Sequence, residues 1–395
     1  MAGRVLVGGV SMTPFATPRH GKPYDVMAET AVRAALADAG LEYSAVQQAY
    51  AGFVYGDSCG GQHALYRVGM TGIPIINVNN MCSTGSTALF LARQAINAGV
   101  DCVLALGFEQ MRPGAVGVLW DDRPSIFTDH LAALRQTVPE AGDIPSPPFT
   151  FGAAGAAYAE KYGTRPETFA SISVKARRHA AHNPHAVYRH PLTVDEVLAS
   201  PHIYGPLTRL QCCAPACGAA AAVLTSEDFA RSHGLRADVA ITAQAMTTDT
   251  TGSFDGDLLR LVGYDLTRSA ARQVYEAAGI GPEDIHLVEL HDGFTVAELI
   301  SYEALGFTPE GTAEKFIADG DNTYGGKVVV NPSGGLLAKG HPLGATGLAQ
   351  CAELVWQLRG EAGPRQVDNA QVALQHNIGL GGAAVLTLYE ELRSF

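Results

Sequence analysis

The chain has 395 residues, enough for two domains of ordinary size, and its 47% hydrophobic and 17% charged residues exclude a disordered protein. The formal net charge of −12 argues against a nucleic-acid-binding surface. Residues 1–20 lack the apolar segment of a signal peptide, and no apolar run is long enough to span a membrane. The seven cysteines form no regular framework of disulfide bonds. We therefore expect a cytoplasmic protein.

Strand and helix signals alternate along the first part of the chain. β-branched and apolar residues predict strands, and helical periodicity predicts a helix over Tyr24–Ala39. The expected strands are Arg4–Gly9, Gln47–Val54, Ile73–Ile76 and Cys102–Leu106. Such alternation is typical of an α/β layered architecture.

Cys82 lies in the segment Asn77–Gly85, where a strand changes into a helix expected over Ser86–Ala98. A thiol at this place faces free backbone N–H groups and the positive end of the helix dipole, and both favour the thiolate. Gly85 would let another backbone or a substrate come close. An isolated cysteine is most often a small core residue, but this position makes Cys82 a candidate nucleophile.

Residues 112–208 differ in composition from the preceding α/β segment, with clustered prolines and a cationic helix. We interpret them as an insertion that lies over the core. Helical patterns occur at Gly155–Tyr162 and Arg165–His179. Prolines cluster before them, at Pro139, Pro145, Pro147 and Pro148. The second helix is locally cationic, with Lys175, Arg177, Arg178 and His179. Such a cluster either meets the phosphates of a cofactor or simply faces solvent.

Three cysteines stand close together in an alanine-rich segment, at Cys212, Cys213 and Cys217. Their spacing fits no zinc pattern, so tight packing of small residues is the better interpretation. Cys59 and Cys351 are likewise interpreted as core thiols.

An internal repeat indicates a duplicated α/β unit. Residues 31–52 and 270–292 each form a helix that ends at Ala-Gly, a short turn and a strand. Residues 83–85 pair in the same way with 345–347, each before a helix, and residues 103–106 pair with 372–375. We therefore expect two halves, 1–235 with the insertion and 236–395, whose loops around Cys82 and His341 face a shared cleft.

Four loops of this duplicated frame carry side chains suited to chemistry. Besides the Cys82 loop they are His291–Phe294, Asn331–Gly344 and Gln375–Gly382. A thiol, imidazoles and glycine-rich loops suit acyl transfer through a thioester, in which cysteine attacks, an imidazole takes its proton and N–H donors hold the oxyanion. His286 and His291 lie on a predicted strand and its loop rather than on a zinc-binding helix, so no metal is expected.

The chain resembles the thiolases, specifically those of the sterol-carrier-protein type. The resemblance covers residues 4–391 and is carried by NMCSTGS at Cys82, by GDNTYGGKVVVNPSGGLLAKGHPLGATGLAQ at residues 320–350 and by residues 371–389. It implies the thiolase fold: two α/β halves stacked as five α-β-α-β-α layers, with an inserted loop domain. Since no second sterol-carrier domain follows Phe395, we expect the stand-alone form.

The resemblance also implies roles for individual residues. Cys82 matches the acyl-accepting nucleophile, His341 the histidine that activates it and His291 an imidazole that holds the thioester oxygen. His376 and Asn377 lie where ordinary thiolases place a second cysteine. Gly381 is a further candidate for acid/base or oxyanion support. Candidates for contact with the substrate and its CoA moiety are Arg178, Gly293, Phe294, Ser333 and Gly334.

The chain departs from the family pattern at Gly293, where thiolases of this type carry their second cysteine. The α-carbon of the released acetyl-CoA fragment must still gain a proton, and loss of a general acid/base typically costs about 10²–10⁴-fold. His376, Tyr324 or a water held by His291 could replace the thiol. The reaction could instead need no such proton, as in decarboxylative condensation, or the protein could only bind acyl thioesters. A larger pocket beside Cys82 for an unusually shaped acyl group is a further option.

The sequence therefore predicts an acyltransferase that acts on 3-oxoacyl-CoA by thiolysis or Claisen-type chemistry through acyl-Cys82, in fatty-acid or sterol degradation. The alternatives are a condensing or carbon-acylating enzyme that needs no second cysteine and an acyl-CoA-binding protein without turnover. CoA is expected as a substrate, with no permanently bound cofactor. A homodimer or a tetramer is the expected assembly.

Overall fold

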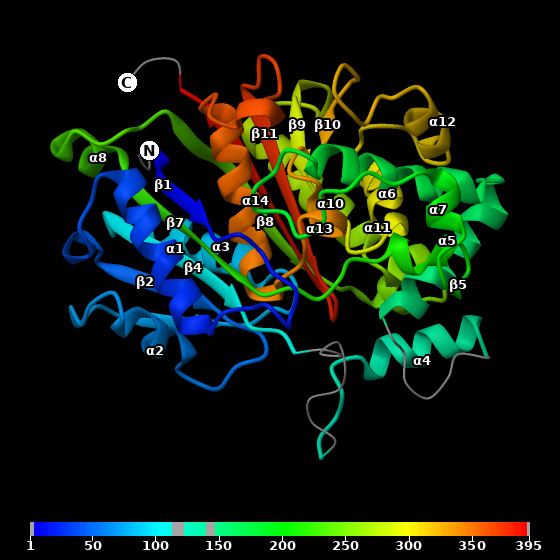
Figure 1. Cartoon of the computed structure of the whole chain (residues 1–395), viewed down its shortest axis with the longest axis horizontal. Coiled ribbons are helices and arrows are strands. Elements are labelled where there is room, and N and C mark those ends of the chain that lie inside the picture. The colour runs from blue at the N-terminus through cyan, green and yellow to red at the C-terminus, as the bar shows by residue number, and fades with distance from the viewer. Residues whose placement is uncertain (1–3, 113–121, 140–146, 393–395) are drawn as a thin grey trace.

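The computed structural model of the chain describes residues 4–112, 122–139 and 147–392, and within them ten strands join in one sheet (Figure 1). Five strands come from the first part of the chain: β1 (Val5–Met12), β2 (Gln48–Gly52), β3 (Ile75–Val78), β4 (Cys102–Glu109) and β7 (Gly218–Ser226). Five come from the second part: β8 (Val239–Thr248), β9 (Leu287–Glu289), β10 (Val329–Val330), β11 (Val372–Gly379) and β12 (Ala383–Glu391).

The strand order is β10-β9-β11-β12-β8-β1-β7-β4-β2-β3, which reads as the same arrangement from either end. β8 corresponds to β1, β12 to β7, β11 to β4, β9 to β2 and β10 to β3. The two sets of strands meet at β1 and β8, where Val5 pairs with Ile241 and Leu6 with Ala240. The repeat seen in the sequence is therefore a repeat of topology, and the two halves are joined edge to edge by a short antiparallel contact.

Helices complete a five-layer α-β-α-β-α arrangement, as expected. The central layer holds α3 (Thr84–Asn97) and α14 (Leu343–Leu358), which pack on each other between the two sets of strands. α1 (Tyr24–Ala39) covers the outer face of the first half, and α10 (Tyr264–Ala278) and α11 (Thr295–Ala304) cover the second. Almost every residue of α14 is buried, because this helix has a neighbour on all sides.

Two glycines allow α3 and α14 to approach closely at their N-terminal ends. A Cβ atom on Gly347 would lie 2.2 Å from the backbone nitrogen of Ser86, and one on Gly85 would lie 2.8 Å from the carbonyl oxygen of Gly344. Both distances are too short for any other residue. The expectation that Gly85 admits a second backbone is thus confirmed, and the contact draws the Cys82 and His341 loops together.

The inserted segment packs on the second half, over α11 and α13 (Gly335–Ala338). Its described elements are α4 (Thr128–Thr137), α5 (Pro147–Tyr162), α6 (Pro166–Ala180), α7 (Val194–Leu198), β5 (His202–Tyr204) and β6 (Leu207–Thr208). Pro147 and Pro148 start α5 instead of a loop, because proline is tolerated in the first turn of a helix. Pro145 lies outside the described residues.

The remaining helices are short surface elements: α2 (Gly60–Tyr66), α8 (Glu227–His233), α9 (Leu258–Leu261) and α12 (Ala313–Ala318). α1 has the bounds that its periodicity predicts, whereas α3 begins two residues before the expected Ser86. None of the helices in the described part of the chain combines the length and apolar character needed to cross a bilayer.

Candidate active site

Three loops bring a thiol and two imidazoles together. The sulfur of Cys82 and one ring nitrogen each of His291 and His341 all lie within 4.8 Å of one another. The two imidazole rings stand edge to face, with their centroids 5.3 Å apart. Cys82 and His341 come from the starts of the paired central helices, and His291 follows β9. The structure therefore joins the three residues predicted from the sequence in one place.

Cys82 sits in a tight turn between β3 and α3. Met81 has a φ of +48°, a left-handed conformation that is uncommon for a residue with a side chain. The carbonyl of Asn80 accepts hydrogen bonds from the backbone N–H of Ser83 at 3.1 Å and from its hydroxyl at 2.8 Å. These bonds hold the turn, which places Cys82 two residues before Thr84, the first residue of α3.

The protonation of Cys82 differs from the expectation drawn from the helix dipole. Burial raises the pKa of the thiol to about 12, the N–H of Leu380 opposes this rise through a hydrogen bond to the sulfur, and the nearby carboxyl of Glu109 adds to it. Desolvation outweighs the dipole because the charged form loses its hydration inside the protein. Cys82 therefore rests as a thiol and needs a base to react.

His341 is oriented to act as that base. Its Nδ1 lies 2.7 Å from the hydroxyl of Thr346, and this hydroxyl donates its own hydrogen to the carbonyl of Pro342 at 3.0 Å. Thr346 must therefore accept from Nδ1–H, which leaves the lone pair on Nε2. Nε2 is buried and has no hydrogen-bond partner among the described residues. Burial, His291 and Lys339 lower the pKa of His341 well below its usual value, so the ring is neutral.

His291 has the opposite tautomer. Nδ2 of Asn377 donates to Nδ1 of His291 at 3.1 Å, so the hydrogen of the neutral ring resides on Nε2. Burial lowers the pKa of His291 to about 4, which keeps the ring neutral near pH 7. His291 consequently offers an N–H donor to the site, while His341 offers an acceptor.

A chain of hydrogen bonds fixes the orientation of the Asn377 amide. Nε2 of Gln375 donates to the carbonyl of Gly347 and to the hydroxyl of Ser86, each at 2.7 Å. The Ser86 hydroxyl therefore donates onward to Oδ1 of Asn377 at 2.9 Å. Because the chain is anchored on a backbone carbonyl, which only accepts, Nδ2 of Asn377 is left to face His291.

The loop after β11 completes the wall around the sulfur. The N–H of Leu380 points at Cys82, and Gly381 follows with a φ of +100° that favours glycine. Glu109, which also lies near the sulfur, accepts hydrogen bonds from the backbone nitrogens of Val54, Tyr55 and Gly344 at 3.0–3.2 Å. Burial raises the pKa of Glu109 to about 7. This carboxyl ties strand ends of the first half to the start of α14.

Cys82, His291 and His341 have the separations of a metal site as well. The tautomers argue for acyl transfer, because a hydrogen on Nε2 of His291 prevents that nitrogen from acting as a ligand. A mixed set of one thiol, one N–H donor and one free lone pair is instead what nucleophilic catalysis requires.

Two candidates for proton transfer are engaged elsewhere. His376 points away from Asn377, on the opposite face of β11. Its Nε2 lies 3.0 Å from the hydroxyl of Thr267, and its Nδ1 accepts from the backbone N–H of His291 at 3.4 Å. Tyr324 is 39% exposed and donates its hydroxyl hydrogen to the carbonyl of Arg365 at 2.7 Å. The sequence-based suggestion that either residue replaces the second thiol is not supported by these contacts.

The candidate substrate-contact residues occupy different environments. Ser333 is buried and donates its hydroxyl hydrogen to Glu289 at 2.7 Å. Gly334 has a φ of +93°, and a Cβ atom on it would lie 2.5 Å from the Cβ of Ala180. Phe294 stacks on Phe151 of α5, with ring centroids 4.7 Å apart. Arg178 is exposed on α6 and donates to the hydroxyl of Thr323 at 2.9 Å.

Cys213 is interpreted from the sequence as a packing residue in an alanine-rich segment. The structure places Cys213 beside the His291 loop, where its backbone N–H donates to the carbonyl of Gly293 at 2.9 Å. A Cβ atom added to Gly293 would lie 4.0 Å from Sγ of Cys213 and 3.1 Å from Nε2 of His291. β7 begins only at Gly218, so Cys213 belongs to the loop that precedes this strand.

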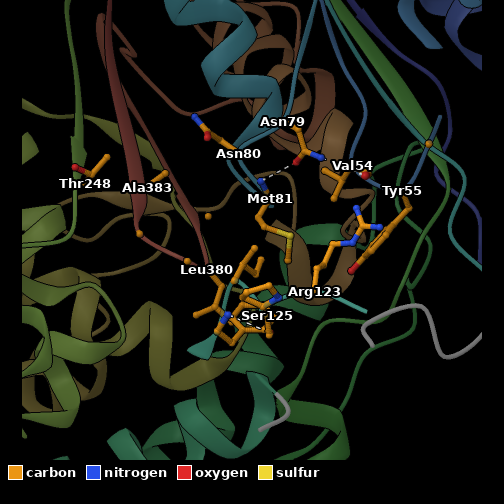
Figure 2. A pocket seen from close by; sticks show the side chains of 17 residues that line it. Val54, Tyr55, Asn79, Asn80, Met81, Arg123, Ser125, Thr248, Leu380 and Ala383 are labelled. Atoms are coloured by element: carbon orange, nitrogen blue, oxygen red, sulfur yellow. Dashed lines mark hydrogen bonds between the residues drawn. The ribbon is translucent and has the colours of Figure 1, made fainter. Parts of the chain in front are cut away.

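A cavity of about 610 Å³ opens next to the Cys82 turn (Figure 2). Met81, which precedes Cys82 in the chain, lines this cavity. Leu380, whose N–H contacts the Cys82 sulfur, lines it as well. Arg123, Ile126 and Phe127 of the insertion also belong to the lining. The size is typical of a small-molecule site. Gly293 does not line this cavity, so the expected enlargement by glycine concerns a different part of the site.

Comparison with known proteins gives two family matches and several long alignments. Residues 5–198 match the family described as thiolase, N-terminal domain, and residues 259–389 match thiolase C-terminal domain-like. The sterol carrier protein 2 of Oryctolagus cuniculus is 53% identical over 98% of this chain and 72% of that protein. The benzoylsuccinyl-CoA thiolase subunit BbsB of Thauera aromatica is 36% identical over 96% of this chain and 95% of that subunit.

Solved structures resemble the whole chain. The Ltp2-ChsH2(DUF35) aldolase has a TM-score of 0.84 at 26% identity, covering 100% of this chain and 99% of that one. Human mitochondrial 3-ketoacyl-CoA thiolase in complex with CoA has a TM-score of 0.74 at 19% identity, covering 99% and 98%. At this identity the second likeness concerns the fold alone.

Proposed function

The chain belongs to the thiolase family, and on this premise we propose that it is a CoA-thioester acyltransferase that works through an acyl intermediate on Cys82. The observation that carries the proposal is the meeting of the Cys82 sulfur with one ring nitrogen each of His291 and His341 within 4.8 Å. The substrate class is 3-oxoacyl-CoA, cleaved by thiolysis or formed by the reverse condensation.

The first step is attack by Cys82 on the 3-oxo carbon of the substrate. Nε2 of His341 takes the thiol proton as the sulfur attacks, because the raised pKa of the thiol leaves too little free thiolate near pH 7. Thr346 supports this role by holding the hydrogen of the ring on Nδ1.

The oxygen of the attacked carbonyl becomes negative and needs donors. We propose that Nε2–H of His291 and the N–H groups around the sulfur, including that of Leu380, supply them. Preorganised N–H donors in a site with little water are effective because they need not reorganise as charge develops. The hydrogen bond from Asn377 supports this arrangement by holding the His291 tautomer.

For the substrate, we propose that its acyl chain occupies the 610 Å³ cavity beside Met81 and Leu380. The CoA moiety would approach from the side of the inserted segment, along Phe294, with the exposed guanidinium of Arg178 near its phosphates. Relatives that carry the name sterol carrier protein 2 support a lipid-derived acyl group. Ser333 and Gly334 then act through the backbone that they shape.

Intact-mass spectrometry after incubation with acetyl-CoA and with acetoacetyl-CoA tests the proposal. We expect an acetyl adduct on Cys82 that is absent in Cys82→Ala. The interpretation of Cys59 as a core thiol is wrong, because the structure leaves it exposed. Cys59→Ala is therefore the matched control, since this thiol would collect any non-specific acylation. No adduct, or one that persists in Cys82→Ala, would exclude an acyl-Cys82 enzyme and leave an acyl-CoA-binding protein or the retro-aldol enzyme considered next.

A second candidate function is carbon–carbon cleavage of the retro-aldol type. It is favoured by glycine at position 293 and by the 26% identity, along the full length, to the Ltp2-ChsH2(DUF35) aldolase. A retro-aldol step breaks the bond without acylating the enzyme. Product formation from a 3-hydroxyacyl-CoA without an adduct on Cys82 would favour this candidate over the acyltransferase.

We also propose a cytoplasmic homodimer or tetramer, with a boundary between halves at residues 235/236. β3 is the last strand in the sheet order, and a strand edge is a ready surface for a second copy. Exposed Tyr66 and Met70 lie in the segment before β3 and support a contact there. Light scattering of the purified chain tests the assembly, and a monomer at micromolar concentration would contradict it.

A further inference from the structure

Cleavage of a 3-oxoacyl-CoA requires a proton donor that Cys82, His291 and His341 do not provide. When the bond between the α-carbon and the 3-oxo carbon breaks, its electron pair stays on the α-carbon of the acetyl-CoA fragment. A positioned acid must protonate that carbon. His341 already holds the proton of Cys82, and Nε2–H of His291 is committed to the carbonyl oxygen. Gly293 brings no side chain to help.

Cys213 lies in a segment that threads between the two histidine loops. Its neighbour Cys212 pairs with Phe294 in an antiparallel bridge, and Pro215 pairs with His341 in a parallel bridge. The backbone N–H of Cys213 itself donates to the carbonyl of Gly293. Backbone contacts on both sides therefore fix the position of this residue relative to His291 and His341.

The sulfur of Cys213 lies close to the space that a side chain at position 293 would enter. It is 4.0 Å from the place where a Cβ of residue 293 would begin, and that place is 3.1 Å from the donor nitrogen of His291. Cys213 is half-buried, as Cys82 is, whereas Cys217 and Cys351 are fully covered. Cys213 as a residue is therefore less covered by its neighbours than these two cysteines are.

Burial is the main reason that Cys213 keeps its proton. Burial raises the pKa of this thiol well above its usual value, and Cys82, Cys212 and Asp292 raise it further. A thiol that stays protonated until a stronger base forms beside it can act as a general acid.

From this geometry we propose, on the basis of the function proposed above, that Cys213 is the catalytic acid/base thiol that compensates for Gly293. As the carbon–carbon bond breaks, the electron pair on the α-carbon takes the Cys213 proton. The products are acetyl-CoA, acyl-Cys82, protonated His341 and Cys213 thiolate. In the second half, Cys213 takes the thiol proton of incoming CoA, whose sulfur attacks acyl-Cys82. The Cys82 sulfur leaves with the electron pair and regains its proton from His341.

The experiment compares acylation with proton transfer to carbon. Acetyl-CoA is incubated with the full chain in D₂O, and mass spectrometry measures acetylation of Cys82 and deuterium in the methyl group of acetyl-CoA. Thiolysis of acetoacetyl-CoA is measured in parallel. We expect Cys213→Ala to keep the acetyl adduct but to lose deuteration and thiolysis by about 10²–10⁴-fold. Cys212→Ala is the matched control, because its thiol bonds to the carbonyl of Thr208, and it should keep both rates.

A rescue distinguishes chemistry from packing. In the Cys213→Ala background, Gly293→Cys returns a thiol to the same space, and Gly293→Ala adds the same Cβ without a thiol. The Cβ at 3.1 Å from Nε2 of His291 requires a shift of a few tenths of an ångström, which both variants share. We expect deuteration to return with cysteine alone.

The outcomes distinguish failure of the role proposed for Cys213 from failure of the acyl transfer through Cys82 on which it rests. Wild-type protein that never acetylates Cys82 would overturn both. Wild-type protein that acetylates Cys82 but incorporates no deuterium, or Cys213→Ala that retains deuteration and thiolysis within threefold, would overturn the role of Cys213 and leave acyl transfer standing. Equal recovery with Gly293→Ala and Gly293→Cys would also reject an acid/base role for a thiol at this place.

Discussion

The amide of Asn377 donates a hydrogen bond to Nδ1 of His291 over 3.1 Å, although 86 residues separate the two in the chain. This contact gives His291 the tautomer that donates from Nε2. Thr346 imposes the opposite tautomer on His341. Two neutral imidazoles thus differ in function only through the residue that contacts Nδ1, and this difference can be tested one bond at a time.

Asn377→Leu should lower the turnover number of thiolysis by about tenfold with little change in KM, since one neutral hydrogen bond that holds the donor tautomer is lost. ¹⁵N NMR of the histidine side chains should show Nε2 of His291 protonated in the wild type and both tautomers in the variant. Gln244→Leu, which removes an amide bonded to Thr387, is the control. An unchanged tautomer with reduced turnover would contradict the explanation.

Thr346→Val should slow acylation of Cys82 by about tenfold to a hundredfold, because Nδ1–H of His341 loses its acceptor and Nε2 is no longer held toward the sulfur. Thr346→Ser keeps the hydroxyl and should react within threefold of the wild type. Stopped-flow measurement of the acetyl-enzyme burst checks both variants. Equal rates for valine and serine would show that the hydroxyl does not orient the base.

Alkylation of Cys82 by iodoacetamide should rise steadily from pH 6 to pH 10 without a plateau, because the pKa of this thiol is raised to about 12. A cysteine–histidine ion pair would instead give a rate that is already high at pH 6. The rate is followed by intact mass, with Cys82→Ala to correct for exposed Cys59. A plateau below pH 8 would contradict the neutral resting state.

Acid should destabilise the protein between about pH 6.5 and pH 4, because three buried histidines resist protonation in the folded state. Burial lowers the pKa of His179 and His376 to about 3 and of His291 to about 4. The unfolded chain takes up these protons near pH 6.5, so stability falls as pH falls. Each group contributes about 2 kcal/mol of this loss at pH 5.

The variant that tests this pH dependence is His179→Gln, which cannot take up the proton in either state. Its free energy of unfolding should fall less steeply than that of the wild type between pH 6.5 and pH 5. Urea denaturation at several pH values measures the slope and corrects for any constant loss of stability. Parallel slopes would exclude His179 as a source of the acid sensitivity.

Gly347→Ala should lower the free energy of unfolding by about 3 kcal/mol, because the added Cβ would stand 2.2 Å from the backbone of Ser86. It should also slow acylation, since α14 carries His341 toward Cys82. Gly252→Ala places its Cβ no closer than 3.5 Å to Thr250 and is the control. Thermal unfolding and the acetyl-enzyme burst measure both effects. A variant as stable as the wild type would contradict the close packing of the two helices.

Much of the fold followed from local patterns. The helix Tyr24–Ala39 has the predicted bounds, because its apolar spacing and the glycine after it act within the element itself. The repeated helix–turn–strand segments predicted the paired halves, and the strand order reads alike from both ends. The position of Cys82 between a strand and a helix, opposite His341, came from the same reasoning.

Protonation states did not follow from the sequence. The helix start at Cys82 predicted a favoured thiolate, but burial dominates and raises the pKa. Desolvation depends on how many atoms from distant segments surround a group, and this number cannot be predicted from the local sequence. The tautomers of His291 and His341 depend in the same way on Asn377 and Thr346 at the appropriate nitrogen.

The sequence by itself determined the alternation of strands and helices, the duplication and the thiol–imidazole pair, because these depend on periodicity and on neighbours along the chain. Only the tertiary structure decided that Cys213 reaches the site and that His376 turns away from it. The loop that contains Cys213 is placed by backbone pairing with the His291 and His341 loops, and strand β11 points alternate residues to opposite faces. Such placements arise from contacts between residues far apart in the chain, which the order of residues does not display.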